Sequence, residues 1–243
     1  MSGHSKWHNI QRTKNAADAK RGQTFTKIAR EIMVSVKEGG SGDPAGNSRL
    51  AAAVAKAKAA NMPNDNIKRT IEKALGAGAG DSYESVVYEG YGPAGIAVIV
   101  EAMTDNRNRT ASDVRHAFDK YGGKLGAAGC VAWSFNRRGV IVVDNEDGGV
   151  DEERMLADAL EAGALDVEAD GAVFELYTEP DGVAAAAGAL EELGYRLLSA
   201  QAEMVPQSRV GLTDAEDIKN MEKMLELLED NDDVQNVWHN REE

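Results

Sequence analysis

The hydrophobic periodicity of the chain changes at a short glycine-rich segment, and this change constrains the fold more than any other feature. Between residue 25 and the segment 76–80, which reads Gly-Ala-Gly-Ala-Gly, apolar side chains recur every three or four residues. That spacing places them on one face of a helix. After the segment, runs rich in Val, Ile and Tyr are typical of strands. The glycine-rich stretch predicts a flexible linker between a helical domain and sheet-containing domains.

Three amphipathic helices are predicted before this linker. The first buries one stripe, formed by Phe25, Ile28, Ala29, Ile32 and Val36. The second begins after Asn47 and the third after Asn64, because asparagine can cap a helix N-terminus. Short amphipathic helices cannot bury their stripes alone, so they are expected to form a three-helix bundle.

The elements predicted after the linker fall into two groups. Strands at 83–91 and 96–103 precede a helix capped within residues 104–106. A run in the order β-α-β-β-α-β, which is the ferredoxin-like order, follows at 140–143, 151–162, 166–168, 173–177, 181–193 and 196–200. The chain then predicts a strand near 203–206, a helix at 213–230 and a strand at 234–238.

The first and last of these elements lack partners, and we expect them to share one sheet. The predicted fold class is therefore α+β multidomain, with an N-terminal three-helix bundle and two α+β domains, at least one of them ferredoxin-like. The predicted boundaries are 1–80 for the basic bundle, 81–132 plus 205–243 for a discontinuous α+β domain, and 133–204 for an inserted ferredoxin-like domain.

The charge is divided sharply along the chain. Residues 1–80 hold 14 Lys and Arg against 6 Asp and Glu, a net charge of +8. Residues 81–243 hold 13 against 35, a net charge of −22, and the two parts give the total of −14. Such asymmetry between segments indicates a nucleic-acid or membrane-surface partner. Two merely solvated faces are the alternative interpretation.

The candidate nucleic-acid-binding residues are mostly cations of the first domain. Phosphate contacts by such residues give affinity that is independent of base sequence and depends on salt. An aromatic residue within a basic arm can also stack on a base. The predicted set is Lys6, Trp7, Arg12, Lys14, Lys20, Arg21, Lys27, Arg30, Lys56, Lys58, Lys68, Arg69, Arg107 and Arg109. Arg107 and Arg109 are included because they lie at a predicted helix start, where anions bind, although simple capping by Asp105 or Asn106 explains that segment equally well.

Enzyme, cofactor and metal sites are not predicted. Residues 90–95 match the glycine pattern of dinucleotide sites, but a strand follows where a helix is required, so the pattern indicates a hairpin turn. Cys130 is expected to be a small buried side chain. His4 and His8 have a metal-compatible spacing without further ligands, and the acidic run at 144–170 has no cation-binding pattern. We therefore expect no catalytic residue, no cofactor and no small-molecule substrate.

The expected location is the cytoplasm. No run approaches about 18 apolar residues, so no membrane span is predicted. The N-terminus lacks an apolar region of the secretory type. A single cysteine excludes an internal disulfide and fits a reducing compartment.

Several motifs along the whole chain resemble the YebC/PmpR family. They lie at 3–7 (Gly-His-Ser-Lys-Trp), 18–22 (Asp-Ala-Lys-Arg-Gly), 57–63 (Ala-Lys-Ala-Ala-Asn-Met-Pro), 88–93 (Tyr-Glu-Gly-Tyr-Gly-Pro), 104–110 (Thr-Asp-Asn-Arg-Asn-Arg-Thr) and 232–240 (Asp-Asp-Val-Gln-Asn-Val-Trp-His-Asn). The resemblance implies three domains and a non-enzymatic role. Members are classed as probable DNA-binding transcriptional regulators, and relatives that include a mitochondrial translational activator point instead to the ribosome and to relief of stalling. Gln11 and Thr13 depart from a more basic family pattern.

Two partners thus remain open from the sequence. The first is DNA, bound by a YebC/PmpR-type regulator of transcription. The alternative is ribosomal RNA within the ribosome, bound by a translation factor that relieves stalling during elongation. An enzyme with a carboxylate-lined cleft is a third alternative, and it predicts stabilisation by a metal ion. A protein–protein adaptor is the fourth, and it predicts no salt-dependent affinity for any polynucleotide.

Overall fold

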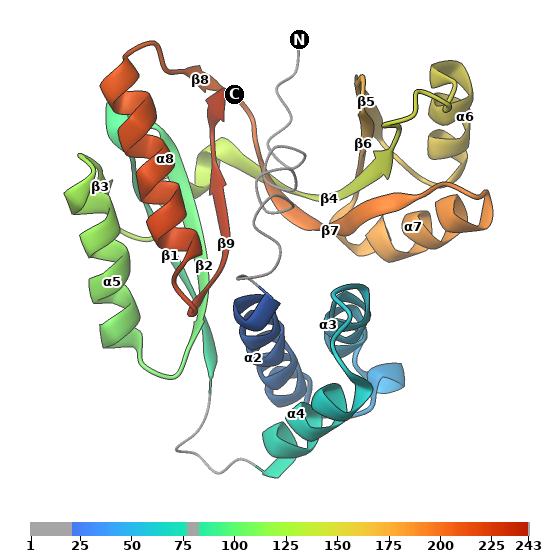
Figure 1. Cartoon of the computed structure of the whole chain (residues 1–243), viewed down its shortest axis with the longest axis horizontal. Coiled ribbons are helices and arrows are strands. Elements are labelled where there is room, and N and C mark those ends of the chain that lie inside the picture. Colours follow the sequence, from blue (N-terminus) through green and yellow to red (C-terminus); the bar gives the residue numbers. More distant parts are fainter. Residues whose placement is uncertain (1–20, 77–82, 243) are drawn as a thin grey trace. The chain divides into compact units, whose positions relative to one another are not determined.

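A computed structural model of the chain describes residues 21–76 and 83–242 (Figure 1). Contacts divide the described residues into two compact units. One contains residues 21–76, 83–131 and 212–239, and the other contains residues 132–211 and 240–242. No helix among the described residues is both long and apolar enough to cross a membrane.

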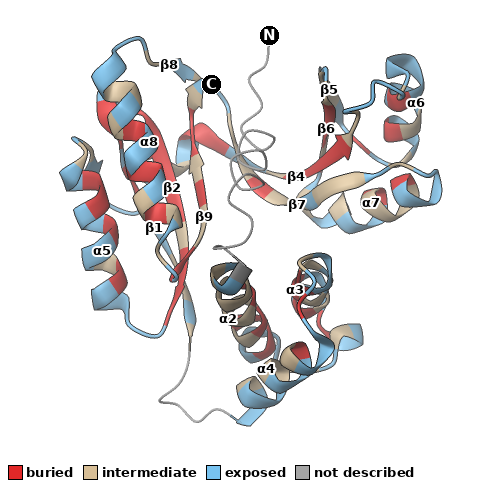
Figure 2. Cartoon of the chain, viewed as in Figure 1, coloured by how far each residue is buried: buried red, intermediate tan, exposed pale blue. Residues whose placement is uncertain are grey.

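The N-terminal part of the first unit is the expected three-helix bundle. Its helices are α2 (Arg21–Gly39), α3 (Ser48–Ala59) and α4 (Asn64–Gly76), with a short 3-10 turn, η1, at Pro44–Gly46. One apolar core joins the three helices, and it is formed by Ile28, Ile32, Val36, Leu50, Ala53, Ala57, Met62 and Ile67. The helical period read from the sequence therefore identified the packed faces (Figure 2).

Asn47 fixes the corner between α2 and α3. Its side-chain oxygen accepts a hydrogen bond from the Leu50 N–H at 3.1 Å, as an N-cap residue does. Its amide nitrogen also donates to the carbonyl oxygens of Ser35 at 2.8 Å and Ser41 at 3.1 Å. The third helix differs slightly from the prediction, because it begins at Asn64 itself.

The rest of the first unit is a four-stranded antiparallel sheet with two helices. The strand order is β3-β1-β2-β9, with β1 at Glu84–Tyr91, β2 at Ala97–Thr104, β3 at Lys124–Leu125 and β9 at Val234–His239. The helices are α5 (Arg107–Lys120) and α8 (Ala215–Glu229). Their apolar residues, Phe118 and Met224 among them, share one core with Val98 and Val100 of β2, so both helices pack on the same face.

The second unit contains the ferredoxin-like domain. Its elements follow the order β4 (Phe135–Asp144), α6 (Glu152–Glu161), β5 (Asp166–Asp170), β6 (Val173–Thr178), α7 (Val183–Glu192) and β7 (Leu197–Pro206). The sheet order is β5-β6-β4-β7 with antiparallel neighbours. Met155, Ala186 and Leu190 of the two helices pack with Ile141 and Leu176 of the sheet. A short parallel pair, β8 (Val210–Gly211) with β10 (Arg241–Glu242), completes the unit.

The structure confirms the α+β class and the ferredoxin-like order but corrects one strand. The separate strands expected at 196–200 and 203–206 are a single strand, β7, which pairs with β4 along its length. Pairing with β4 continues through Ala200, Gln201 and Ala202, which join the two predicted strands into one. The domain boundaries at residues 80, 132 and 204 stay a prediction, and the linker at 77–80 lies outside the described residues.

Candidate nucleic-acid interface

Some of the predicted interface residues lie outside the described residues, and the others lie on helices. Five of them, Lys6, Trp7, Arg12, Lys14 and Lys20, lie outside the described residues. Arg21 is the first residue of α2. The others are placed in pairs on four helices: Lys27 and Arg30 on α2, Lys56 and Lys58 on α3, Lys68 and Arg69 on α4, and Arg107 and Arg109 on α5.

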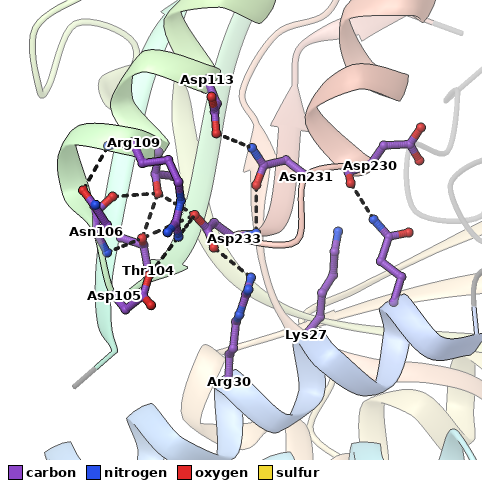
Figure 3. Close-up of polar contacts among 12 residues, drawn as sticks. Lys27, Arg30, Thr104, Asp105, Asn106, Arg109, Asp113, Asp230, Asn231 and Asp233 are labelled. Carbon is purple, nitrogen blue, oxygen red and sulfur yellow. Dashed lines mark hydrogen bonds and ion pairs between the residues drawn. The ribbon is translucent and has the colours of Figure 1, made fainter. Parts of the chain in front are cut away.

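Arg30 and Arg109 meet at one buried carboxylate, that of Asp233 (Figure 3). The Asp233 side chain is 4% exposed and precedes β9. Arg30 Nη1 lies 2.9 Å from Asp233 Oδ1, and Arg109 Nη2 lies 2.7 Å from Asp233 Oδ2. Thr110 Oγ1 donates to Asp233 Oδ2 at 2.7 Å. Asp233 therefore joins α2 of the bundle to α5 of the neighbouring sheet domain.

The surroundings of Asp233 keep it ionised. Burial acts to raise the pKa of its carboxyl, but hydrogen bonds from Arg109 and Thr110 and the charge of Arg30 outweigh burial and lower the pKa below its ordinary value. Hydrogen bonds to Asp233 and Asp105 raise the pKa of the Arg109 guanidinium. Arg30, Arg109 and Thr110 thus stabilise the ionised carboxylate of Asp233.

Lys27 and Gln23 extend this contact to the end of α8. Lys27 Nζ donates to the Glu229 carbonyl at 2.6 Å, and Gln23 Nε2 donates to the Asp230 carbonyl at 2.7 Å. The last carbonyls of a helix have no partners within it, and cations near them also interact favourably with the helix dipole. Side chains of α2 therefore cap α8 from a distant part of the sequence.

The contacts of Lys27, Arg30 and Arg109 give these residues a role within the chain. Arg30 is only 12% exposed and lies over the Tyr83 ring, 5.4 Å from its centroid. Arg109 keeps 46% of its side chain exposed. The sequence did not single out Asp233, because no local spacing relates it to arginines that precede it by more than a hundred residues.

The segment at 104–109 is a helix cap in the structure. The Asn106 side chain accepts a hydrogen bond from the Arg109 N–H at 3.1 Å. Arg107 forms an exposed ion pair with Glu84 at 2.9 Å. Of the two interpretations left open by the sequence, capping is therefore the one with direct contacts.

Other predicted cations remain on the surface of the bundle. Lys58, Lys68 and Arg69 are exposed. Lys56 pairs with Glu31 at 2.8 Å and keeps 40% of its side chain exposed. Arg69 donates to the Asn66 side chain at 2.6 Å, which holds its guanidinium close to α4. The outer surfaces of α3 and α4 thus carry the cations available for a phosphate backbone.

The glycine pattern at 90–95 is explained by packing. A turn, η2, at Pro93–Gly95 joins β1 to β2, and no helix follows it. A Cβ atom on Gly90 would lie 2.6 Å from the Lys124 carbonyl oxygen and 2.7 Å from Phe118 Cε1. A Cβ atom on Gly92 would lie 2.9 Å from Met224 Cε. The glycines thus allow close contact with β3, α5 and α8.

Enzyme-like features are weak in the described part of the chain. Cys130 is partly buried, and both burial and the Glu89 carboxylate raise the pKa of its thiol, which disfavours the nucleophilic thiolate. Among the described residues, no group of three or more His, Cys, Asp or Glu side chains has the arrangement of a metal site.

Comparison with known proteins gives matches along the chain. The model of the TACO1/YebC protein N-terminal domain matches residues 5–77, and that of the TACO1/YebC second and third domain matches residues 83–241. A "probable transcriptional regulatory protein" of Acetivibrio thermocellus is 52% identical over 99% of this chain and 98% of its own length. A second protein of that description, from Ruminiclostridium cellulolyticum, is 53% identical over 100% of this chain and 97% of its own length. The crystal structure of a conserved hypothetical protein from Aquifex aeolicus superposes with a TM-score of 0.84 at 46% identity, covering 93% of this chain and 91% of that one.

Proposed function

The chain belongs to the TACO1/YebC family, and we propose that it regulates gene expression by binding nucleic acid through its basic helical bundle. One observation carries the proposal. The net charge of +8 in residues 1–80 coincides with exposed cations on α3 and α4, whereas the remainder of the chain carries −22. The relatives named above as probable transcriptional regulatory proteins support the same class of function.

The proposed contact is with the phosphate backbone. Lys58, Lys68 and Arg69 present charges that neutralise phosphates, and such contacts position a protein without reading base sequence. We expect the basic residues at 6–21 to add to this contact. Arg30, Lys27 and Arg109 support it from within by fixing α2 against α8 and α5.

The acidic remainder helps to orient the protein. A surface of high negative charge repels a polyanion, so the bundle is the face that approaches it. We therefore propose affinity with weak sequence specificity, since none of the helices within residues 21–76 and 83–242 presents a row of base-reading side chains.

Duplex DNA is the first proposed target. Structured ribosomal RNA is the second, and one observation favours it. The exposed cations Lys58, Lys68 and Arg69 are spread over two helices rather than along one recognition helix, which suits recognition by shape and phosphate position.

A charge-reversal pair tests the proposal. Lys58→Glu with Lys68→Glu changes two exposed bundle lysines, and Lys219→Glu with Lys223→Glu changes two exposed lysines of α8 by the same charge. We expect the bundle pair alone to weaken binding to duplex DNA or ribosomes, and to reduce the slope of log K against log salt by about 2. Equal effects of the two pairs would show that only the net charge matters and would contradict the proposed interface.

A further inference from the structure

Strands β4 and β7 extend beyond the rest of the ferredoxin-like sheet (Figure 1). Strand β6 pairs with β4 only from Gly139 to Asp144, whereas β7 pairs with β4 from Phe135 onward. The residues before Gly139 therefore form a two-stranded ribbon with the end of β7. We call residues 133–138 and 204–209 the ribbon tip.

The ribbon tip carries the most exposed large apolar side chain in the described part of the chain. Trp133 is 73% exposed and lies in a 3-10 turn at Ala132–Ser134. Its backbone is fixed, because Gln207 Nε2 donates to the Trp133 carbonyl at 2.9 Å and the Gln207 N–H donates to the Ser134 carbonyl at 2.9 Å. Phe135, two residues on, is buried. The Trp133 indole is thus exposed to solvent, while hydrogen bonds hold the backbone that carries it.

The charge around Trp133 differs from the rest of its unit. Residues 132–211 contain 5 Arg, no Lys and 17 Asp or Glu. All 17 acids lie within residues 144–203, so residues 133–138 and 204–209 have none, and Glu203, the cross-strand partner of Arg138, borders them. Three of the five arginines lie in the tip, namely Arg137, Arg138 and Arg209. Arg137 is exposed, and Arg138 pairs with Glu179 at 3.2 Å.

The ribbon tip also carries amide groups. Gln207 Nε2 also approaches Asn136 Oδ1 at 3.3 Å, and Asn136 is exposed. An exposed aromatic ring on the same short ribbon as arginines and amides is a combination that binds single-stranded nucleic acid. A base stacks on the ring, while cations neutralise the neighbouring phosphates. An apolar protein partner would use the ring but not the cations.

We propose that the ribbon tip binds single-stranded nucleic acid, with a base stacked on Trp133 and a phosphate near Arg137. The inference rests on the proposed function in that the protein acts on nucleic acid. The proposed site lies in a different unit of the chain from the bundle, and its ligand is a single strand rather than a duplex or a folded RNA. DNA and RNA share the stacking base and the phosphate, and the experiment separates them.

Fluorescence of Trp133 tests the stacking directly. The chain has three tryptophans, so Trp7→Phe with Trp238→Phe leaves Trp133 as the single fluorophore. This variant is titrated with oligodeoxyuridylate, with oligouridylate and with an abasic oligonucleotide of equal length. We expect quenching by one or both base-containing strands, the stronger quencher identifying the preferred sugar, and little quenching by the abasic strand. Equal quenching by the abasic strand would overturn the proposal.

Affinities in the otherwise native chain provide the second measurement. Trp133→Ala should weaken binding of the preferred oligonucleotide roughly tenfold, within the range measured for stacked bases, and Arg137→Ala should weaken it by a smaller factor. Arg154→Ala, which changes an exposed arginine of α6 in the same unit, is the control and should leave it unchanged. Unchanged affinity in Trp133→Ala would sink the proposal.

The bundle variant separates this proposal from the proposed function. Lys58→Glu with Lys68→Glu should weaken binding to duplex or ribosome and leave the Trp133 quenching in place. Loss of the quenching in that variant would show that the tip has no binding of its own and would overturn the inference. An unchanged affinity of the bundle variant for duplex and ribosome, with quenching retained, would contradict the bundle interface alone.

Discussion

Asp233 places one buried carboxylate between two arginines of different helices, Arg30 of α2 and Arg109 of α5. The carboxylate is 4% exposed and the Arg30 side chain 12% exposed, so water screens the attraction between these two groups weakly. Its backbone carbonyl also accepts a hydrogen bond from the Met103 N–H at 2.7 Å. A single residue therefore connects the bundle, β2 and α5.

Asp233→Asn tests the strength of this connection. The amide keeps the size of the side chain but removes its charge, which leaves the Arg30 guanidinium, 12% exposed, without its counter-charge. Removing one partner of a buried ion pair costs about 3 kcal/mol or more. We expect a lower free energy of unfolding by that amount in urea denaturation at pH 7. The neighbouring exposed Asp232→Asn should change it by less than about 0.5 kcal/mol, and equal effects would contradict the account.

The effect of Asp233→Asn should depend on pH in a defined direction. The folded-state pKa of Asp233 is lowered, so its stabilising contribution is present above the unfolded-state pKa of about 3.9 and is lost as the pH falls through the folded value. The difference between native chain and variant should therefore be largest near neutral pH and shrink below about pH 4. Urea denaturation at pH 7, 5 and 3 measures it. A difference that persists undiminished at pH 3 would argue against an ionised Asp233.

For single residues, the sequence predicted contacts between neighbours in the chain and missed contacts between residues far apart in it. Asn47 and Asn106 were recognisable as caps because a cap bonds to a backbone N–H three residues on. Asp233 was not recognisable, since its partner Arg109 lies 124 residues away. For the same reason Lys27 and Arg30 were predicted as phosphate contacts, although α8 and Asp233 engage them.

The turn between β1 and β2 shows how an element can imitate a functional motif. Gly90 is a glycine because β3 and Phe118 approach its backbone closely. Gly90→Ala should lower the free energy of unfolding by about 1–3 kcal/mol, as overpacking does. Gly149→Ala, at a position with nothing within 4 Å of an added Cβ, is the control. A nearly neutral Gly90→Ala would mean that packing does not explain this glycine.

Most elements were predictable because each has a period or a cap of its own. The helices of the bundle and the β-α-β-β-α-β order follow from apolar spacing, and the structure has them in that order. The continuity of β7 was not predictable, because Ala200 to Ala202 belong to a strand only through their pairing with β4. The full length of β4, which creates the ribbon, depends on the same pairing.

The division of charge is the property of the whole molecule that most constrains its partners. The basic bundle and the acidic remainder differ by 30 charges, from +8 to −22. A polyanion is attracted to the first part and repelled by most of the second. The ribbon tip is the part of the acidic unit that has arginines and no acidic residue, which is why a separate single-strand site is proposed there.

The salt dependence of binding by the intact chain tests the central claim most directly. Affinity for duplex DNA and for purified ribosomes is measured between about 50 and 200 mM salt, a range over which phosphate contacts weaken strongly. The account predicts binding to at least one of them, with log K falling linearly against log salt and a slope of about −2 or steeper. Tighter binding to ribosomes near physiological salt would assign the protein to translation, and tighter binding to a duplex would assign it to transcription. Absence of binding to both, or an affinity that does not change with salt, would contradict the account.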